Sequence, residues 1–185
     1  MEMLKNHKRS NKLGRYVVTG GPGVGKSLVF QELRRRGYNC SEGEIARDLY
    51  RDFKKKLGRH LEVGDRREYS RMVLGAFIKE YCNHKKGAYF YNRGIPDGAG
   101  WDRFFKLSVS DELNEAMHAY KYDGIFVLDP IANFEDETDV VWTSERDGQR
   151  VHQLIVQGYV DVGYDPIFVP MDFVENRVNF ILSNL

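Results

Sequence analysis

Short hydrophobic runs alternate along the chain with longer segments in which apolar residues recur at every third or fourth position. Runs of this length predict buried strands, and the recurring spacing predicts helices with one apolar face. The expected strands cover residues 15–19, 38–41, 88–92, 124–128 and 166–169. The expected helices cover residues 27–36, 42–57, 66–83, 100–105, 110–120, 145–162 and 172–185.

This alternation of strands and helices predicts a three-layer α/β fold with a five-stranded parallel sheet. Right-handed crossovers place the carboxyl ends of parallel strands at one edge of the sheet, where such proteins bind their ligands. The polar side chains that follow the strands are therefore expected to converge on one cleft, beside the loop after the first strand. They are Glu42, Glu44, Asn92, Arg93, Asp97 and Asp129.

Residues 20–27, Gly-Gly-Pro-Gly-Val-Gly-Lys-Ser, match the P-loop pattern G-x-x-x-x-G-K-[ST]. Glycines let backbone N–H groups curl around phosphate oxygens, and the N-terminus of the following helix adds partial positive charge. Lys26 is expected to reach the β- and γ-phosphates, and the Ser27 hydroxyl to hold Mg²⁺. An ordinary glycine-rich turn is the alternative, but the strand before the motif and the helix after it favour nucleotide binding. The expected nucleotide contacts are Gly21, Gly23, Val24, Gly25, Lys26, Ser27 and Leu28.

Phosphoryl transfer also requires a carboxylate that steadies the metal and its waters, and often a base. Asp97 and Glu44 are the candidates for the metal, with Asp97 the expected ligand beside Ser27. Glu44 is the preferred base and Asp97 the second choice. The structural alternatives are support of a helix dipole for Glu44 and a helix N-cap for Asp97. We expect Lys26, Glu44, Arg93 and Asp97 to be the catalytic residues.

Several arginines are placed to contact phosphate or substrate. Arg93 follows the third strand and can grip a phosphate, with a structural ion pair as the alternative. Arg47 lies one helical turn after Glu44, so it can orient that carboxylate or bind substrate. Arg146 and Arg150 are spaced by four on one helix and resemble lid arginines over the nucleotide, with a solvated helix face as the alternative. The irregular segment before them extends the expected lid to residues 131–150.

Composition limits the type of protein, its cellular compartment and its partners. The chain has 185 residues and a net charge of +1, with 42% hydrophobic and 30% charged residues, as in soluble globular proteins. Residues 1–14 are basic and predict a flexible tail, and residues 15–185 predict one domain. Two cysteines without metal-ligand spacing favour a reducing cytoplasm, and no stretch has the length of a membrane span. The lysine and arginine clusters favour solvated surfaces over a nucleic acid partner, and nothing indicates an oligomeric state.

Three motifs resemble one known family. Residues 20–27 are followed by Gly-Glu-Ile-Ala-Arg at 43–47 and by Tyr-Asn-Arg-Gly-Ile-Pro-Asp at 91–97. In this order they resemble the small single-domain P-loop family of AAA-type predicted ATPases, which is similar to nucleoside and nucleotide kinases and to the ribosylnicotinamide kinase domain. The segment 145–170 also matches the end of that family. The resemblance implies a kinase-type sheet with strand order 2-3-1-4-5, and ATP with Mg²⁺ as the nucleotide.

The third-strand motif departs from the family at Asn92, where the family usually has aspartate. An amide cannot act as a base and is a weaker partner for Mg²⁺, so any base role passes to Glu44 and Asp97. The chain is predicted to be an ATP-binding phosphotransferase that moves the γ-phosphate to a hydroxyl of a nucleoside, a nucleotide or modified nucleic acid. A nucleotide-hydrolysing switch remains the alternative because of Asn92, and a polyphosphate hydrolase is a third possibility.

Overall fold

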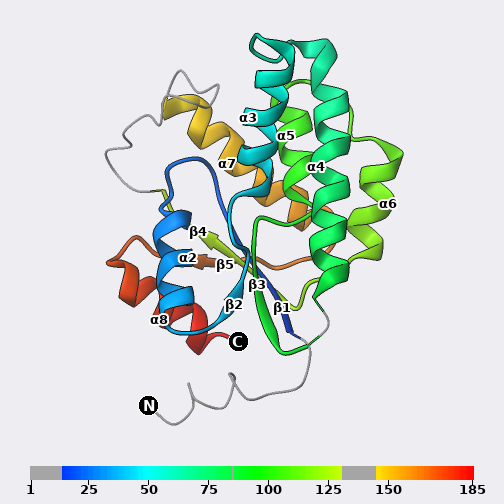
Figure 1. The fold of residues 1–185 in the computed structure, drawn as a ribbon. Helices are drawn as coiled ribbons and strands as arrows, with labels where there is room; N and C mark the ends of the chain where they lie inside the picture. Colours follow the sequence, from blue (N-terminus) through cyan, green and yellow to red (C-terminus); the bar gives the residue numbers. More distant parts are fainter. Residues whose placement is uncertain (1–13, 85, 131–144) are drawn as a thin grey trace.

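The computed structural model describes residues 14–84, 86–130 and 145–185. The five strands form one parallel sheet in the order β2-β3-β1-β4-β5, which confirms the predicted fold and strand order (Figure 1). The strands are β1 (Gly14–Thr19), β2 (Asn39–Cys40), β3 (Ala88–Asn92), β4 (Gly124–Leu128) and β5 (Ile167–Val169). The helices are α2 (Lys26–Arg35), α3 (Ile45–Leu57), α4 (Val63–Asn83), α5 (Asp97–Phe104), α6 (Asp111–Ala119), α7 (Glu145–Val160) and α8 (Val174–Ser183).

The central strand β1 is buried on both faces because helices cover the sheet from both sides. Val18 packs into a cluster with Phe30 of α2 and Ile181 of α8. Val17, which points to the opposite face, packs with Ile155 of α7. Successive side chains of a strand alternate between faces, so the run Val17-Val18 needs an apolar layer on each side. This is the three-layer arrangement that the alternation of strands and helices predicted.

A group of helices extends from one face of the sheet beyond the carboxyl ends of the strands. In Figure 1, α3 and α4 stand side by side there, with α5 behind them and α6 to the right of α4. Val73 and Phe77 of α4 pack with Ile95, Leu113 and Met117 in one apolar cluster. The side chains of Tyr50, Phe53 and Leu61 form a second, smaller cluster at the far end. These clusters hold α3 and α4 over the edge of the sheet where the P-loop lies.

Several element boundaries differ from those predicted, and the starts of α3, α4 and α5 each move by three residues. Helix α4 begins at Val63 and not at residue 66, because Glu62 and Asp65 form a capping box at its start. Helix α5 begins at Asp97 and not at residue 100, so the expected polar turn is shorter. Strand β2 has two residues, because it pairs with β3 only at Asn39 and Cys40. Apolar periodicity identifies the element, but the backbone contacts at its ends decide where it stops.

Two predicted segments fall wholly or mainly outside the described residues. They are the basic tail of residues 1–14, of which Gly14 alone is described as the first residue of β1, and residues 131–144 of the expected lid. Within the described parts of the chain, no helix is long and apolar enough to cross a membrane.

Candidate active site

The P-loop connects β1 to α2 and folds around its own lysine. Gly20, Gly23 and Gly25 have φ angles of 132°, 70° and 84°, a region that side chains with a Cβ rarely adopt. The buried Lys26 ammonium donates hydrogen bonds to the carbonyl oxygens of Gly21 at 2.7 Å and Gly20 at 3.3 Å. Burial, together with the neighbouring Arg93, lowers the pKa of Lys26 to about 7. This ammonium is therefore held by backbone carbonyl groups, and among the described residues it forms no ion pair with a carboxylate.

Two residues to which the sequence analysis gave no role brace this loop from outside. The N–H of Gly21 donates to Nδ1 of His152 on α7 at 3.1 Å. Arg177 of α8 donates to the carbonyl oxygens of Val24 at 2.7 Å and Asp129 at 3.0 Å. Gly148 and His152 lie four residues apart on one face of α7, and a Cβ on Gly21 would meet both at 3.0 Å. The i, i+4 spacing shows only that Gly148 and His152 share a helix face, and no local pattern in the sequence pointed to their contact with the loop.

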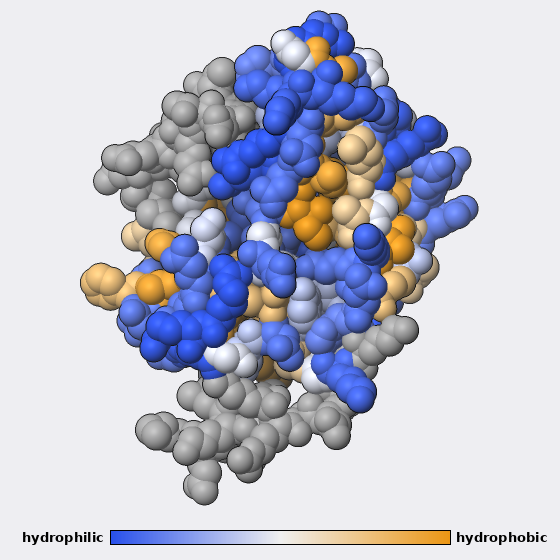
Figure 2. Space-filling model, viewed as in Figure 1, coloured by the Kyte–Doolittle hydropathy of each residue, from blue (hydrophilic) through white to orange (hydrophobic). Residues whose placement is uncertain are grey.

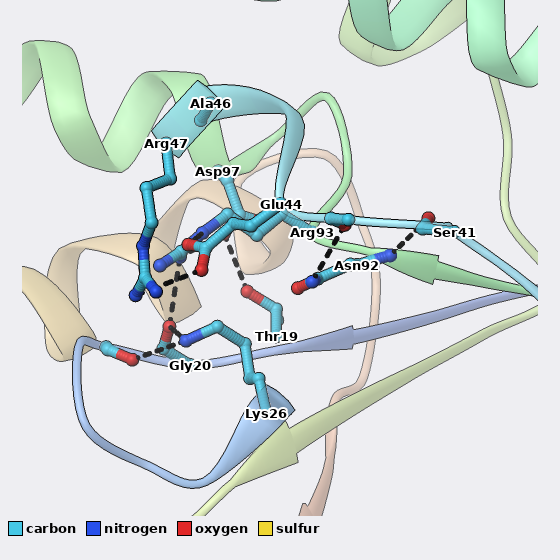
Figure 3. Close-up of polar contacts among 12 residues, drawn as sticks. Thr19, Gly20, Lys26, Ser41, Glu44, Ala46, Arg47, Asn92, Arg93 and Asp97 are labelled. Carbon is cyan, nitrogen blue, oxygen red and sulfur yellow. Dashed lines mark hydrogen bonds and ion pairs between the residues drawn. The ribbon is translucent and has the colours of Figure 1, made fainter. Parts of the chain in front are cut away.

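Arg93 links the P-loop to the carboxylates beside it (Figure 3). Its Nη1 donates to the Gly20 carbonyl oxygen at 3.0 Å and to Asp97 Oδ1 at 3.1 Å, and its Nε donates to Glu44 Oε1 at 3.0 Å. The side chain is 5% exposed, and the backbone has a φ of 73°, which is strained for a residue with a Cβ. A strained arginine with both Nε and Nη1 engaged holds its guanidinium in a fixed position.

Asp97 is the first residue of α5 and lies buried between β1 and α7. It is 1% exposed, and its carboxylate accepts from the Thr19 hydroxyl, Arg93, the Gly94 N–H and the Tyr159 hydroxyl. A carboxylate has about four lone-pair sites, so these four donors fill them. The expected roles of Asp97 as a Mg²⁺ ligand or a base stay predictions, and each would require one of these four hydrogen bonds to be exchanged. In this arrangement Asp97 holds Arg93 in position and joins β1 to α7.

Glu44 precedes α3 and faces the P-loop from the opposite side of the cleft. Arg47 Nη2 lies 3.3 Å from Glu44 Oε2. The two side chains are therefore paired across one turn of helix, as their spacing in the sequence suggested. Burial by itself would raise the pKa of Glu44, but the charges of Arg93, Lys26 and Arg47 outweigh burial and lower that pKa to about 2. Glu44 is therefore a stable anion at neutral pH.

Asn92 ends β3 between Ser41 and this cluster. Its backbone N–H donates to the Ser41 hydroxyl at 2.9 Å, and its Nδ2 donates to the Gly43 carbonyl oxygen at 3.1 Å. Its buried Oδ1 has no hydrogen-bond partner. In Figure 3 this oxygen points to the side of the cleft where Thr19 and Lys26 lie. A buried acceptor without a donor is costly, so this atom marks a place where a ligand or water would be stabilised.

A pocket opens next to these polar groups, between α3, α4 and α5. Its volume is about 110 Å³. Aromatic and aliphatic side chains make most of its wall, and Glu44, Arg47 and Arg93 stand at the end that Pro22 of the P-loop closes. On the face shown in Figure 2, hydrophobic residues lie at the surface between α3 and α4, with hydrophilic residues around them. The apolar part of the wall consists of Ala46, Tyr50, Tyr69, Val73, Leu74, Phe77, Ile95, Gly98, Trp101, Phe105 and Leu113.

Arg146 and Arg150 lie elsewhere on α7. Both are exposed, and Arg150 stands over the Phe104 ring at 5.9 Å. They are spaced by half a turn from Gly148 and His152, so they lie on the side of α7 that faces away from the P-loop. In this arrangement α7 does not present them to the loop, and their role as lid arginines stays a prediction.

Comparison with known proteins identifies the fold and the family. The model of the AAA domain family matches residues 15–177. A deoxyadenosine kinase from M. mycoides with bound dCTP superimposes with a TM-score of 0.60 at 13% identity, over 94% of this chain and 98% of that one. The NadR protein in complex with NR gives a TM-score of 0.60 at 14% identity, over 97% of this chain and 51% of that one. These likenesses confirm the P-loop kinase-like fold.

One curated relative shares a short segment. A Thermoplasma volcanium protein named "Putative adenylate kinase" is 56% identical over 32 residues, which are 17% of this chain and 21% of that protein. The match therefore spans about a fifth of the relative's length. The family model covers most of the chain, from β1 into α8. The chain therefore belongs to the AAA domain family.

Proposed function

We propose that the chain is an ATP-dependent phosphotransferase that moves the γ-phosphate of ATP to an acceptor hydroxyl. The observation that carries this proposal is Arg93, which contacts the P-loop carbonyl of Gly20 and the pocket carboxylate Glu44 at once. A phosphate on the P-loop and a small molecule in the pocket would therefore lie on the two sides of one guanidinium. The described neighbours bind nucleotides, since a deoxyadenosine kinase holds dATP and NadR holds NAD and AMP-PNP.

Each residue of the cluster has a distinct task in this proposal. Lys26 leaves the carbonyl oxygens of the loop and pairs with the terminal phosphates, and the loop N–H groups surround the oxygens. The exposed Ser27 hydroxyl at the start of α2 would hold Mg²⁺, which screens the phosphate charge when bound. Asn92 Oδ1 is suitably placed as a neutral acceptor for a water or hydroxyl nearby. Arg93 stabilises negative charge on the transferred group.

Glu44 orients the acceptor in this scheme. With a pKa of about 2, it is a weak proton acceptor, but it can accept a hydrogen bond from the hydroxyl and aim its oxygen at phosphorus. A loose phosphoryl-transfer transition state requires positioning more than full deprotonation. The acceptor oxygen forms a bond to the γ-phosphorus while the bond to the β-phosphate oxygen breaks. ADP leaves, and the hydroxyl proton passes through Glu44 to solvent.

The test is to incubate the protein with Mg²⁺ and ATP labelled in the γ-phosphate, together with pools of nucleosides, nucleotides, aromatic alcohols and modified oligonucleotides. We expect label to appear on a member of one pool. Glu44→Gln should reduce that transfer by about 10² or more, because the neutral amide loses the charge that holds Arg93 and Arg47 in place and attracts the hydroxyl proton. Label found as free phosphate alone, at a rate that no pool changes, would contradict the proposal.

A nucleotide-hydrolysing switch is the second candidate, and Asn92 is the observation that favours it. The family usually has an aspartate there, and a neutral amide gives weaker support to Mg²⁺ and its waters. The pool experiment separates the two functions, since a switch releases phosphate to water. A nucleic acid acceptor has its own signature, because its binding would weaken steeply with added salt.

Asn92→Asp is expected to raise the rate of ATP turnover by about tenfold or more. The new carboxylate would stand where Oδ1 now lacks a donor, close to Lys26 and Arg93, and would strengthen the hold on metal-bound water. The variant loses the hydrogen bond from Nδ2 to the Gly43 carbonyl oxygen, so its thermal unfolding must be measured together with its turnover. Asn176→Asp on α8 is the matched control. An unchanged or lower rate in a folded Asn92→Asp protein would show that the amide does not limit turnover.

A further inference from the structure

Arg66 of α4 is a buried cation that has no role in the proposed phosphate transfer. It is 7% exposed, and its guanidinium carbon lies 3.4 Å from the centre of the Phe105 ring. In the described part of the chain, no carboxylate pairs with it and no oxygen accepts a hydrogen bond from it. A guanidinium carries five N–H donors, and no nitrogen of Arg66 is among the fully buried atoms without a partner, so these donors stay accessible to solvent or to a ligand. Burial lowers the pKa of Arg66, in keeping with this lack of a partner.

The carboxylate next to Arg66 in sequence is occupied elsewhere. Asp65 accepts from Arg59 and from the backbone N–H of Glu62 in the capping box. The adjacent Arg67 is satisfied, since it donates to the Ser108 carbonyl oxygen at 2.9 Å. Arg66 thus differs from its neighbours, whose charged groups are paired on the outside of α4.

Arg66 lines the same pocket as Glu44 and Arg93. Five charged residues line that pocket, three arginines and two carboxylates, which leaves one positive charge in excess. Arg93 bonds both carboxylates, and Arg47 also contacts Glu44, so the uncompensated charge resides on Arg66. The charges of Arg93, Glu44 and Arg66 all act on the Tyr69 hydroxyl, so this hydroxyl lies near all three. The pocket wall therefore combines the polar cluster around Arg93, aromatic side chains and the cation of Arg66, which packs on Phe105.

We infer that the acceptor is an aromatic or heteroaromatic alcohol that also carries an oxyanion, a carboxylate or a phosphate, which binds Arg66. This inference rests on the proposed function for the hydroxyl, which would face Glu44. The aromatic ring fits the wall between Tyr69, Trp101 and Phe105. A pocket of about 110 Å³ accommodates one such ring but no large polymer segment.

The first test measures binding without nucleotide, by calorimetry with benzoate, phenyl phosphate and benzamide. The wild-type protein is expected to bind benzoate or phenyl phosphate about tenfold or more tightly than neutral benzamide, because hydrogen bonds to charged groups are the strong ones. The better of the two anions distinguishes a carboxylate from a phosphate. Arg66→Met should abolish the preference, and Arg66→Lys should keep part of it. Arg71→Met, which removes an exposed arginine of the same helix, is the matched control.

Three results would overturn the inference: equal affinities for anion and amide, no binding of any probe at millimolar concentration, or a preference that survives in Arg66→Met. Thermal unfolding checks that each variant is folded. If Arg66→Met does not fold, the comparison of Arg66→Lys with the wild type still tests the inference. The second test offers 4-(hydroxymethyl)benzoate and 4-(hydroxymethyl)benzamide as acceptors with labelled ATP. Preferred labelling of the benzoate supports the inference, and equal labelling contradicts it. Anion binding through Arg66 without transfer to any acceptor would instead overturn the proposed function alone.

Discussion

Lys26→Met is expected to lower ATP turnover by a factor of about 10² to 10³. The variant keeps the length of the side chain and removes the ammonium that we propose pairs with the terminal phosphates. The loss should appear in ATP affinity as well, measured by calorimetry, because the loop carbonyls of Gly20 and Gly21 would then face the nucleotide without a cation between them. Lys79→Met, which removes an exposed lysine of α4, should leave turnover unchanged.

The same variant separates loss of function from loss of fold. A buried ammonium without a carboxylate partner contributes little to stability, so Lys26→Met should unfold at or above the wild-type temperature. Undiminished turnover in a folded Lys26→Met protein would exclude the P-loop as the site of ATP chemistry. A variant that unfolds early would contradict the assigned environment of Lys26.

The free energies of unfolding of the wild type and of Lys26→Met should also diverge as the pH changes. The pKa of Lys26 is about 7 in the folded protein and about 10.4 in an unfolded chain. Between these values the unfolded chain binds more protons, so the free energy of unfolding of the wild type rises with pH relative to Lys26→Met. The limiting slope is about 1.4 kcal/mol per pH unit. Urea titrations of both proteins at pH 7, 8 and 9 measure this slope. If the free energies of unfolding of the two proteins change in parallel with pH, the pKa of Lys26 is not lowered.

Gly100→Ala is expected to destabilise the fold by about 3 kcal/mol, the largest stability effect that we predict. A Cβ on Gly100 would lie 2.6 Å from the backbone N and Cα of Ile155. Those atoms belong to α7 and cannot rotate away as a side chain would, so α5 and α7 must separate. The separation would also displace Tyr159 from Asp97 and His152 from the P-loop.

Gly75→Ala on α4 is the matched control for this substitution. A Cβ there meets nothing within 4 Å, so alanine should stabilise the helix by about 1 kcal/mol through its higher helix propensity. Urea denaturation of both variants measures the difference. Equal stabilities of the two variants would show that α5 and α7 do not approach as closely as the fold requires.

Much of the fold follows from periodicity and composition. The hydrophobic run of β1 and the eight residues after it predict the strand, the phosphate loop and the start of α2. The rule that parallel strands end at one edge brings Glu44 and Arg93 to the same cleft, and the structure pairs them. Strand order came from the resemblance, because local patterns say nothing about which strands are neighbours in the sheet.

Partners of buried polar groups could not be predicted from sequence. Asp97 follows a strand, as a metal ligand would, but four donors from β1, α7 and the preceding turn fill its carboxylate. Arg66 belongs to a basic pair that resembles any solvated helix face, yet it turns inward over Phe105. His152 gave no metal spacing and nonetheless accepts the N–H of Gly21. The contacts of Asp97 with β1 and α7, of Arg66 with Phe105 and of His152 with Gly21 each join residues that are far apart in the chain.

The sequence by itself determined that this protein has a P-loop, an α/β sheet and charged residues gathered at its edge, because these depend on local spacing and on the handedness of the chain. Only the tertiary structure decided which of those charges are satisfied. Hydrogen-bond capacity is used up by whichever donors packing brings within about 3 Å. Packing completes the shell of Asp97 and leaves Asn92 Oδ1 and Arg66 without partners, and these two positions are where we expect ligands to bind.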